Sequence, residues 1–429
     1  MEAIAEETLE APQHATFRPG MDRGAMNRAL GLVGAGLFIT TLAQTNVIGQ
    51  LPFRALFKDQ LHMTAFQQAN FIAIATFAWY FKPLAGLLCD SVPLFGTRRR
   101  SYLILMGVLS GACWLSFLLA HTYMQFLWVS LLLNACMVVA STVVGGLLVE
   151  AGQVGGMTGR LSSLRYASDN LINIIVGPLG GYLATLTFMW TASIGAALLW
   201  ALVPVTILLL HEPVDRSVNK EIWKKAGAQF RIIVRSHTMW WTAGLMMLVF
   251  IAPGFGVALT YYQRDVLHFS WKFIGFLTLL GGVGGMLAAG LYAWLCKRFP
   301  LRPLLYGGVF LNAMSSILYL GYHSAHAAML IDSSNGFLGY LGILPLFDLA
   351  ARATPKGSES FGYALIMSVY NIAVFAISYP IGSYLYDRWH HDLMRLVWLN
   401  SLTSLVALAL LPFLPAILTS TSDGESVSA

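Results

Sequence analysis

Long apolar runs dominate the chain, and polar residues gather in the short stretches between them. About twelve runs approach the roughly 20 residues that a helix needs to cross the hydrocarbon core of a membrane. None alternates over about ten residues as a membrane β-strand would. The pattern therefore predicts an all-α membrane protein with twelve transmembrane helices. Their expected cores are residues 28–50, 64–90, 101–121, 124–150, 160–185, 187–211, 238–262, 270–296, 301–322, 325–352, 358–386 and 392–418.

Composition and charge agree with a membrane protein. Of the 429 residues, 57% are hydrophobic and 11% are charged, against about a quarter charged in soluble domains. Cytoplasmic loops retain lysine and arginine, so the uneven distribution of these residues predicts that both termini face the cytoplasm. The net charge of +6 reflects this bias and indicates no nucleic-acid site. The sparser, outward loops are expected to hold Arg54, Lys58, Arg264, Lys272, Arg388 and Arg395.

One long polar break divides the chain between two groups of six expected helices. Within it, "KEIWKKAGAQFRIIVRS" is typical of an amphipathic helix at the membrane surface, with a plain linker helix as the alternative. We therefore expect a cytoplasmic tail at 1–27, a bundle at 28–211, a linker at 212–237, a second bundle at 238–418 and a cytoplasmic tail at 419–429.

The two halves contain related segments. "GPLGGYLATL", from Gly177, and "YPIGSYLYDR", from Tyr379, share proline, glycine and tyrosine at matching positions. Internal repeats of six helices are typical of secondary transporters, and chance similarity between apolar helices is the alternative.

Polar residues inside the expected helices are candidates for substrate binding or proton coupling, because an ionisable group costs about 2.5 kcal/mol or more at the centre of a membrane helix. Lys82 and Asp169 are expected at similar depth and could interact. Tyr166, Asp169 and Asn173 share one helical face. A lysine that reaches the membrane surface and hydrogen bonds that hold helices together are the alternatives. The full set is Lys82, Asp169, Asn173, Tyr166, Gln44, Asn46, Asp332, Asn335, Tyr370 and Asn371.

Nothing in the sequence indicates an enzyme, a cofactor or a metal. The four cysteines form no CxxC pair and are expected to be free thiols, and the histidines show no metal-binding spacing. No nucleophile with a nearby base is apparent. "LLGGVGGMLAAG" lies inside an apolar helix, so it is no dinucleotide loop. The first 27 residues lack the pattern of a signal or transit peptide, and a bacterial inner membrane fits best.

The loop between the second and third expected helices concentrates charge in "KPLAGLLCDSVPLFGTRRRSYLIL". Glycine, aspartate and an arginine cluster here resemble the pattern of the major facilitator superfamily, where the aspartate lies near the N-terminus of the eleventh helix when the inner side is closed. A carboxylate beside a helix N-terminus gains roughly 0.3 to 1 kcal/mol. The arginines are expected to pair with acids such as Glu150, and topology alone is the alternative. The expected gating residues are Gly86, Asp90, Arg98, Arg99, Arg100 and Glu150.

The same loop closely resembles the folate-biopterin transporter family, whose members read much like K-P-L-x-G-x-x-x-D-S-V-P-L-F-G-x-R-R-R-S-Y-L. "LLVEAG", "FIGFLTLLGGVGG" and "LAARATPKGSESFGYALIMSVYN" extend the resemblance over most of the membrane domain. It implies a major facilitator fold and a transporter that moves a pterin, folate or similar anion by alternating access.

The resemblance is incomplete in the fourth helix, where family members typically carry acids at the positions of Ser141 and Gly145. Proton coupling and the cargo therefore stay open. The alternatives are a transporter of a drug, peptidoglycan fragment or lipid, and a receptor that moves nothing. We expect a monomer in the lipid bilayer.

Overall fold

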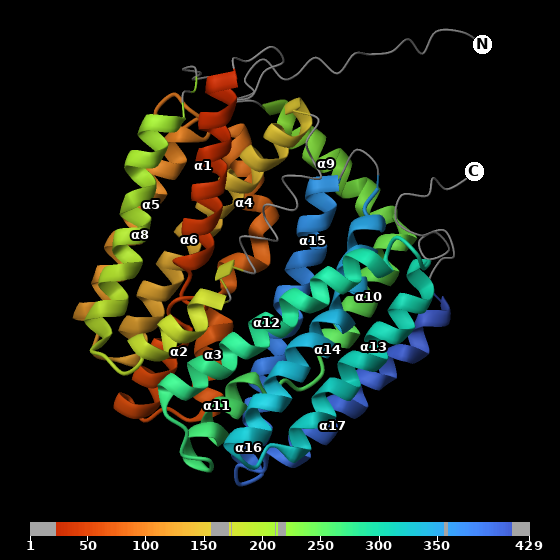
Figure 1. Cartoon of the computed structure of the whole chain (residues 1–429). Coiled ribbons are helices and arrows are strands. Elements are labelled where there is room, and N and C mark those ends of the chain that lie inside the picture. The colour runs from red at the N-terminus through yellow and green to blue at the C-terminus, as the bar shows by residue number, and fades with distance from the viewer. Residues whose placement is uncertain are drawn as a thin grey trace.

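The computed structural model describes residues 23–155, 171–172, 174–210, 212, 220–355 and 359–413. In these ranges every regular element is a helix (Figure 1). The N-terminal half contains α1 (Arg23–Leu42), α2 (Gln50–Ala55), π-helical η1 (Leu56–Gln60), α3 (Ala65–Ala75), η2 (Phe77–Phe81), α4 (Lys82–Ser91), α5 (Arg100–Ser116), η3 (Phe117–Leu119), α6 (Tyr123–Gly155), an apolar helix at Ile174–Leu183, and α8 (Phe188–Leu209).

Helix α9 (Lys220–Arg235) lies in the polar break and leads into the C-terminal half. That half contains α10 (His237–Phe250), α11 (Gly256–Asp265), α12 (Trp271–Leu295), α13 (Leu301–Ile317), η4 (Leu318–Gly321), α14 (Ala325–Arg352), α15 (Glu359–Asn371), π-helical η5 (Ile372–Ser378), α16 (Tyr379–Arg388), α17 (Leu393–Val406) and η6 (Ala407–Phe413).

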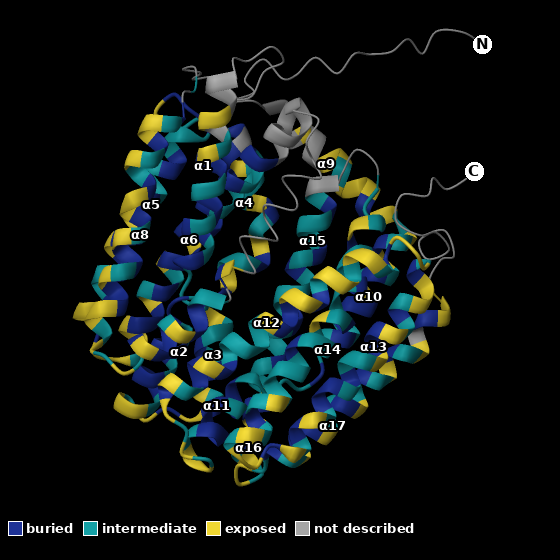
Figure 2. Ribbon diagram, viewed as in Figure 1, coloured by how far each residue is buried: buried dark blue, intermediate teal, exposed yellow. Residues whose placement is uncertain are grey.

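Length and composition make most of these helices suitable for a membrane. Among the described residues, seven helices are long and apolar enough to cross one, and the bent pair Ala65–Ala75 and Phe77–Cys89 would make an eighth. Large apolar side chains such as Trp128, Leu208 and Leu287 are exposed, and lipid would cover them. Figure 2 shows exposed positions along the outer helices of the bundle. The expected all-α membrane fold is confirmed, and the count of twelve spans stays a prediction.

Besides the bent second span, two spans expected to be continuous are broken. The first was expected at 28–50, but α1 ends at Leu42 and helix resumes at Gln50 and continues to Gln60. The seventh was expected at 238–262, but turns at 251–255 separate α10 from α11. Proline lacks the N–H that donates a helical hydrogen bond, and glycine has a low helix propensity. Pro253 and Gly254 therefore account for the break between α10 and α11.

The two halves lie side by side and have separate apolar cores (Figure 1). The N-terminal core surrounds the fully buried Trp114, whose indole nitrogen donates to the Ala43 carbonyl at 3.0 Å. Helix α3 also joins the C-terminal side, because Ala65 and Ala69 pack with Val257 of α11 and its neighbours. We call the end where α1 begins and α9 lies the linker end, and the opposite end, where η1 meets α11, the far end.

Candidate functional site

A cavity of about 170 Å³ lies between the halves, lined by α2, α3 and the junction of η5 with α16. Its polar side chains come almost entirely from the N-terminal half, and aromatic rings cover much of the remainder. The lining residues are Thr45, Asn46, Gln50, Phe53, Arg54, Phe57, Gln68, Phe71, Ile72, Ala75, Thr76, Phe375 and Tyr379. Such a cavity, apolar with a few convergent polar groups, is typical of a small-molecule site.

Arg54 is the charged residue among those that line the cavity. Its Nη1 donates to Oγ1 of Thr260 on α11 at 2.5 Å, so it bridges the two halves. Its Nε is buried and, within the described chain, has no hydrogen-bond partner. The sequence placed Arg54 in an outward loop. The loop placement was wrong, because helix resumes at Gln50 and the part-buried Arg54 lies in α2.

Gln68 supplies a second unsatisfied group to the same cavity. The residue is 1% exposed, and among described residues nothing donates to its Oε1. A buried polar atom without a partner costs about 1 to 3 kcal/mol. Arg54 and Gln68 both line the cavity, and each carries a buried polar atom without a hydrogen-bond partner among the described residues.

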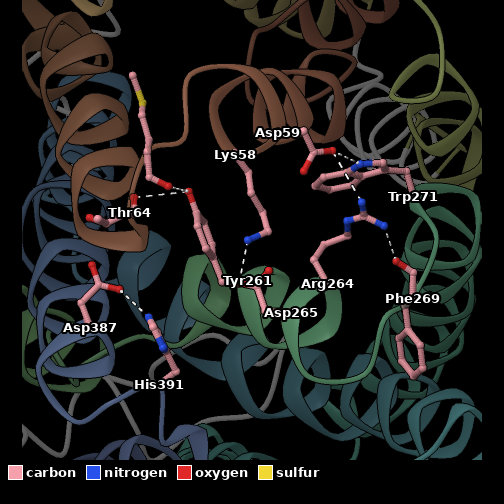
Figure 3. A network of polar contacts seen from close by, with 11 residues as sticks. Lys58, Asp59, Thr64, Tyr261, Arg264, Asp265, Phe269, Trp271, Asp387 and His391 are labelled. Atoms are coloured by element: carbon pink, nitrogen blue, oxygen red, sulfur yellow. Dashed lines mark hydrogen bonds and ion pairs between the residues drawn. The ribbon is translucent and has the colours of Figure 1, made fainter.

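Charged and polar contacts join the halves below the cavity, at the far end (Figure 3). Lys58 Nζ lies 2.6 Å from Asp265 Oδ2, with the two side chains 14% and 52% exposed. The Phe66 amide donates to Asp387 at 2.9 Å. The Tyr261 hydroxyl donates to the Met63 carbonyl at 2.8 Å.

Asp59 completes this set of contacts. Its Oδ2 accepts the Trp271 indole N–H at 2.8 Å and lies 3.6 Å from the guanidinium of Arg264. We call the contacts of Lys58, Asp59 and Phe66 with Asp265, Arg264 and Asp387 the polar seam.

A second contact between the halves is made of backbone against backbone. Gly177 and Gly181, on the helix at Ile174–Leu183, lie against Gly275 of α12. A Cβ atom at Gly181 would lie 2.7 Å from the Trp271 carbonyl oxygen and 2.9 Å from the Gly275 Cα. A Cβ at Gly177 would lie 2.6 Å from the Gly275 carbonyl oxygen. No side chain fits in this glycine seam.

The internal repeat noticed in the sequence coincides with these two seams. The first copy, from Gly177, forms the glycine seam with α12, and the second, from Tyr379, forms α16, which packs against α3 of the other half. The Phe66 and Tyr384 rings meet there edge to face, with centroids 5.3 Å apart. Each copy therefore binds the opposite half.

Asp332 lies inside the C-terminal half, away from the residues that line the cavity. Its two carboxylate oxygens accept hydrogen bonds from the hydroxyls of Tyr319 and Tyr322 at 2.7 and 2.6 Å. Gln263 of α11 donates to the Tyr322 hydroxyl at 2.6 Å, and the Asn335 side chain lies near Tyr319. The expected Asp332 and Asn335 pair is thus part of one buried polar group.

The other described candidates lie at several places. Asn46 lines the cavity, whereas the Gln44 amide donates to the Thr40 carbonyl of its own chain segment at 3.1 Å. Tyr370 packs edge to face on Phe250, with centroids 4.7 Å apart, and Asn371 ends α15.

Lys82 begins α4 and contacts α6. Its Nζ donates to Ser141 Oγ at 3.3 Å and lies 5.2 Å from the Trp79 ring centroid. Ser141 is a position at which the resemblance leads one to expect an acid, so Lys82 faces that position. The expected partner Asp169 lies outside the described residues, together with Tyr166 and Asn173, and this interaction stays a prediction.

The expected gating loop lies at the linker end. Glu212 accepts the backbone N–H groups of Arg98, Arg99 and Arg100 at 2.9, 3.0 and 2.9 Å and so caps α5. A Cβ at Gly86 would lie 3.3 Å from a methyl group of Thr142, so this glycine faces α6.

The partners predicted for this loop are only partly described. Helix α4, which carries Asp90, contacts α15. The side chains of Asp90 and Glu150 lie outside the described part, so their gating contacts stay predictions.

Sequence reasoning missed most residues of the cavity, Gln50, Arg54 and Gln68 among them. A signal was present, because Asn46, Gln50, Arg54 and Lys58 recur at four-residue spacing and so share one helical face. That spacing continues across the end of the apolar run, which is why a hydropathy scan does not register it.

Comparisons with known proteins agree with this architecture. Two solved structures share the fold. The nucleoside transporter NupG has a TM-score of 0.66 and 13% identity, and the match covers 90% of this chain and 99% of that one. A D-xylose-proton symporter has a TM-score of 0.64 and 14% identity, and the match covers 94% of this chain and 99% of that one. The predicted major facilitator fold is confirmed.

Curated relatives extend the agreement to the sequence. The folate-biopterin transporter of Synechocystis sp. is 29% identical over 400 residues, which cover 86% of this chain and 78% of that protein. Folate transporter 2 of Plasmodium falciparum is 24% identical over 415 residues, which cover 90% and 87%. These relatives are named as transporters, which agrees with the prediction that the chain is not an enzyme. The BT1 family model matches residues 45–428, and the chain therefore belongs to the BT1 family.

Proposed function

We propose that the chain is a secondary transporter of a pterin- or folate-like solute, and that its substrate binds in the cavity between the halves. The carrying observation is the position of this cavity: residues of both halves line it, and the polar seam joins the halves at the far end. Family membership and relatives named for folate and biopterin support the substrate class.

The size of the cavity supports alternating access. Sites that bury a drug-sized ligand enclose about 300 to 1,000 Å³, and the cavity here is about 170 Å³. We infer that this conformation encloses only part of such a solute. Opening of one end would enlarge the cavity, so the two seams must separate when the far end opens.

The orientation and the inner gate follow from the charge distribution. With arginine and lysine retained in the cytoplasm, the linker end and both termini face inward and the far end faces outward. The inner gate is then formed by Gly86, Asp90, Arg98, Arg99, Arg100 and Glu150. A monomer in a bacterial inner membrane fits this arrangement.

Asp332 is the described candidate for a proton carrier, and Asp169 is the other. Two tyrosine hydroxyls hold the Asp332 carboxylate, and Gln263 connects that group to α11. Helix α11 also carries Arg264 and Asp265 of the polar seam. Protonation of Asp332 would therefore change the hydrogen bonds that hold α11, the helix that closes the far end.

Uptake of labelled folate and biopterin into vesicles tests the function. We expect uptake above that of empty vesicles, with accumulation abolished by a proton uncoupler. Asp332→Asn should lose accumulation but retain exchange of internal for external solute, since exchange needs no net proton movement. If neither solute were taken up, the proposal would be contradicted. Accumulation that resists the uncoupler would exclude proton coupling.

A further inference from the structure

We propose that Arg54 and Gln68 form the recognition site for a flat heterocyclic carboxylate, with Arg54 binding the acidic group and Gln68 accepting an N–H from the ligand. This inference rests on the proposed function and names the residues and ligand chemistry of the same cavity. It concerns side chains that the sequence did not single out.

The first argument is the charge of Arg54. Its side chain lies in α2 among the buried residues Leu51, Phe53 and Ala55. In the described part of the chain its one hydrogen bond goes to the neutral Thr260 hydroxyl, and no carboxylate pairs with it. Arg54 is part-buried, and a cation withdrawn from water without a counter-ion is costly. An anionic ligand would supply that counter-ion.

The second argument is the geometry of the guanidinium. It carries N–H groups in a planar fork that matches a carboxylate with two parallel hydrogen bonds. Thr260 occupies Nη1, and the buried Nε lacks a partner. The edge formed by Nε and Nη2 therefore remains for a carboxylate while Nη1 keeps its contact across the halves.

The third argument is the rest of the cavity. Gln68 is buried and its Oε1 has no donor among the described residues, so a ligand N–H would satisfy it. Phe53, Phe57 and Phe71 supply aromatic faces from the same half, and Phe375 and Tyr379 supply them from the other. Flat rings pack well on such faces. The cavity thus combines a cation, an acceptor and aromatic faces, which together fit an anionic heterocycle.

Folate and biopterin separate the role of charge from that of the ring. Folate carries carboxylates, and biopterin has the same type of ring without them. We expect Arg54→Gln to weaken folate binding by about tenfold to a hundredfold, because hydrogen bonds to charged groups are the strong ones. Biopterin binding should change little. Arg54→Lys, which keeps the charge but not the fork, should fall between Arg54→Gln and the unmodified protein.

Gln68 variants make the complementary test. Gln68→Leu removes the acceptor and should weaken folate and biopterin alike. Gln68→Glu adds a carboxylate to the cavity of Arg54 and should weaken folate more than biopterin. Arg388→Gln is the matched control, since Arg388 is exposed and contacts Tyr384 at the far end.

The measurement is binding of each labelled solute to purified full-length protein, with size-exclusion profiles to confirm that every variant folds. Loss of folate binding with retained biopterin binding in Arg54→Gln is the expected result. Equal folate binding by Arg54→Gln and the unmodified protein would overturn the inference, even if both transport folate and the proposed function holds. Equal loss of both solutes in a folded Arg54→Gln protein would also overturn it. Binding of neither solute by the unmodified protein would contradict both proposals.

Discussion

The two seams hold the halves together by different interactions. In the glycine seam, Gly181 and Gly275 bring two backbones so close that a Cβ atom would not fit. In the polar seam, the Lys58 and Asp265 side chains meet at the partly exposed far end. Atoms added to this backbone contact cost about 1 to 3 kcal/mol or more, whereas an exposed ion pair contributes about 1 kcal/mol or less. We infer that the glycine seam permits closure and that the polar seam adjusts how stable closure is.

The largest effect is expected from a side chain in the glycine seam. Gly181→Leu forces a side chain against the Trp271 carbonyl and the Gly275 backbone, so the far end should not close and uptake should be abolished. Overpacking by smaller groups costs about 1 to 3 kcal/mol, so Gly181→Ala should disfavour closure by about fivefold or more. Uptake measurements on both variants check this order.

Gly290→Ala is the control for a side chain added to α12, the helix against which Gly181 packs. Gly290 lies on α12, as Gly275 does, but a Cβ there meets nothing within 4 Å. We expect it to transport like the unmodified protein. Normal uptake by Gly181→Leu would show that the glycine contact is not required.

A smaller effect is expected from loss of charge in the polar seam. Asp265→Asn removes the ion pair with Lys58 and should shift the equilibrium away from far-end closure by about fivefold or less, since exposed pairs contribute about 0.2 to 1 kcal/mol. The exchanged pair, Lys58→Asp with Asp265→Lys, should recover part of the loss. Accessibility of Gln68→Cys to a thiol reagent applied from the far side measures the shift. No recovery in the exchanged pair would argue against a direct interaction.

Salt should distinguish the seams more finely. The Debye length falls from about 8 Å at 0.15 M to 3 Å at 1 M salt, so salt weakens exposed ion pairs and leaves backbone packing unchanged. Far-end accessibility in the unmodified protein should rise slightly at 1 M salt. Asp265→Asn should respond less, and an equal response in both proteins would mean that another charged contact controls closure.

The smallest effect is expected from Asp387→Asn, since Asp387 accepts the Phe66 amide through a carboxylate oxygen. Asp387→Asn retains a carbonyl oxygen for that hydrogen bond, so uptake should change little, whereas Asp387→Ala leaves the amide without this acceptor and should lower it. Neutral hydrogen bonds contribute about 0.5 to 1.5 kcal/mol. Equal uptake defects in the two variants would indicate that the charge of Asp387, and not its hydrogen bond, matters.

Most spans could be predicted because a membrane helix needs one property, an apolar run of sufficient length. The expected cores at 101–121 and 270–296 lie close to Arg100–Leu119 and Trp271–Leu295. The two similar segments also fall at the two seams between the halves. The fold was therefore largely accessible from local pattern and from the resemblance of the charged loop.

The cavity could not be predicted in the same way. Arg54 was assigned to a loop because polar residues from Gln50 onward lower the hydropathy of a segment that is nevertheless helical. Its contact with Thr260, like that of Lys58 with Asp265, joins residues about two hundred positions apart. Local periodicity shows which residues share a face, and only the packing of the halves shows what that face meets. Lys82 was expected near Asp169, which lies outside the described residues, and two of its described contacts are with Ser141 and the Trp79 ring.

The most direct test of alternating access is the distance across the far end. Spin labels at Gln60→Cys and Val266→Cys, on exposed positions of opposite halves, would be placed in a protein whose four buried cysteines are replaced by alanine. We expect a short distance, a second longer one whose population changes when folate is added, and mainly the longer one in Gly181→Leu. A single short distance under every condition, in protein that transports folate, would contradict opening of the far end.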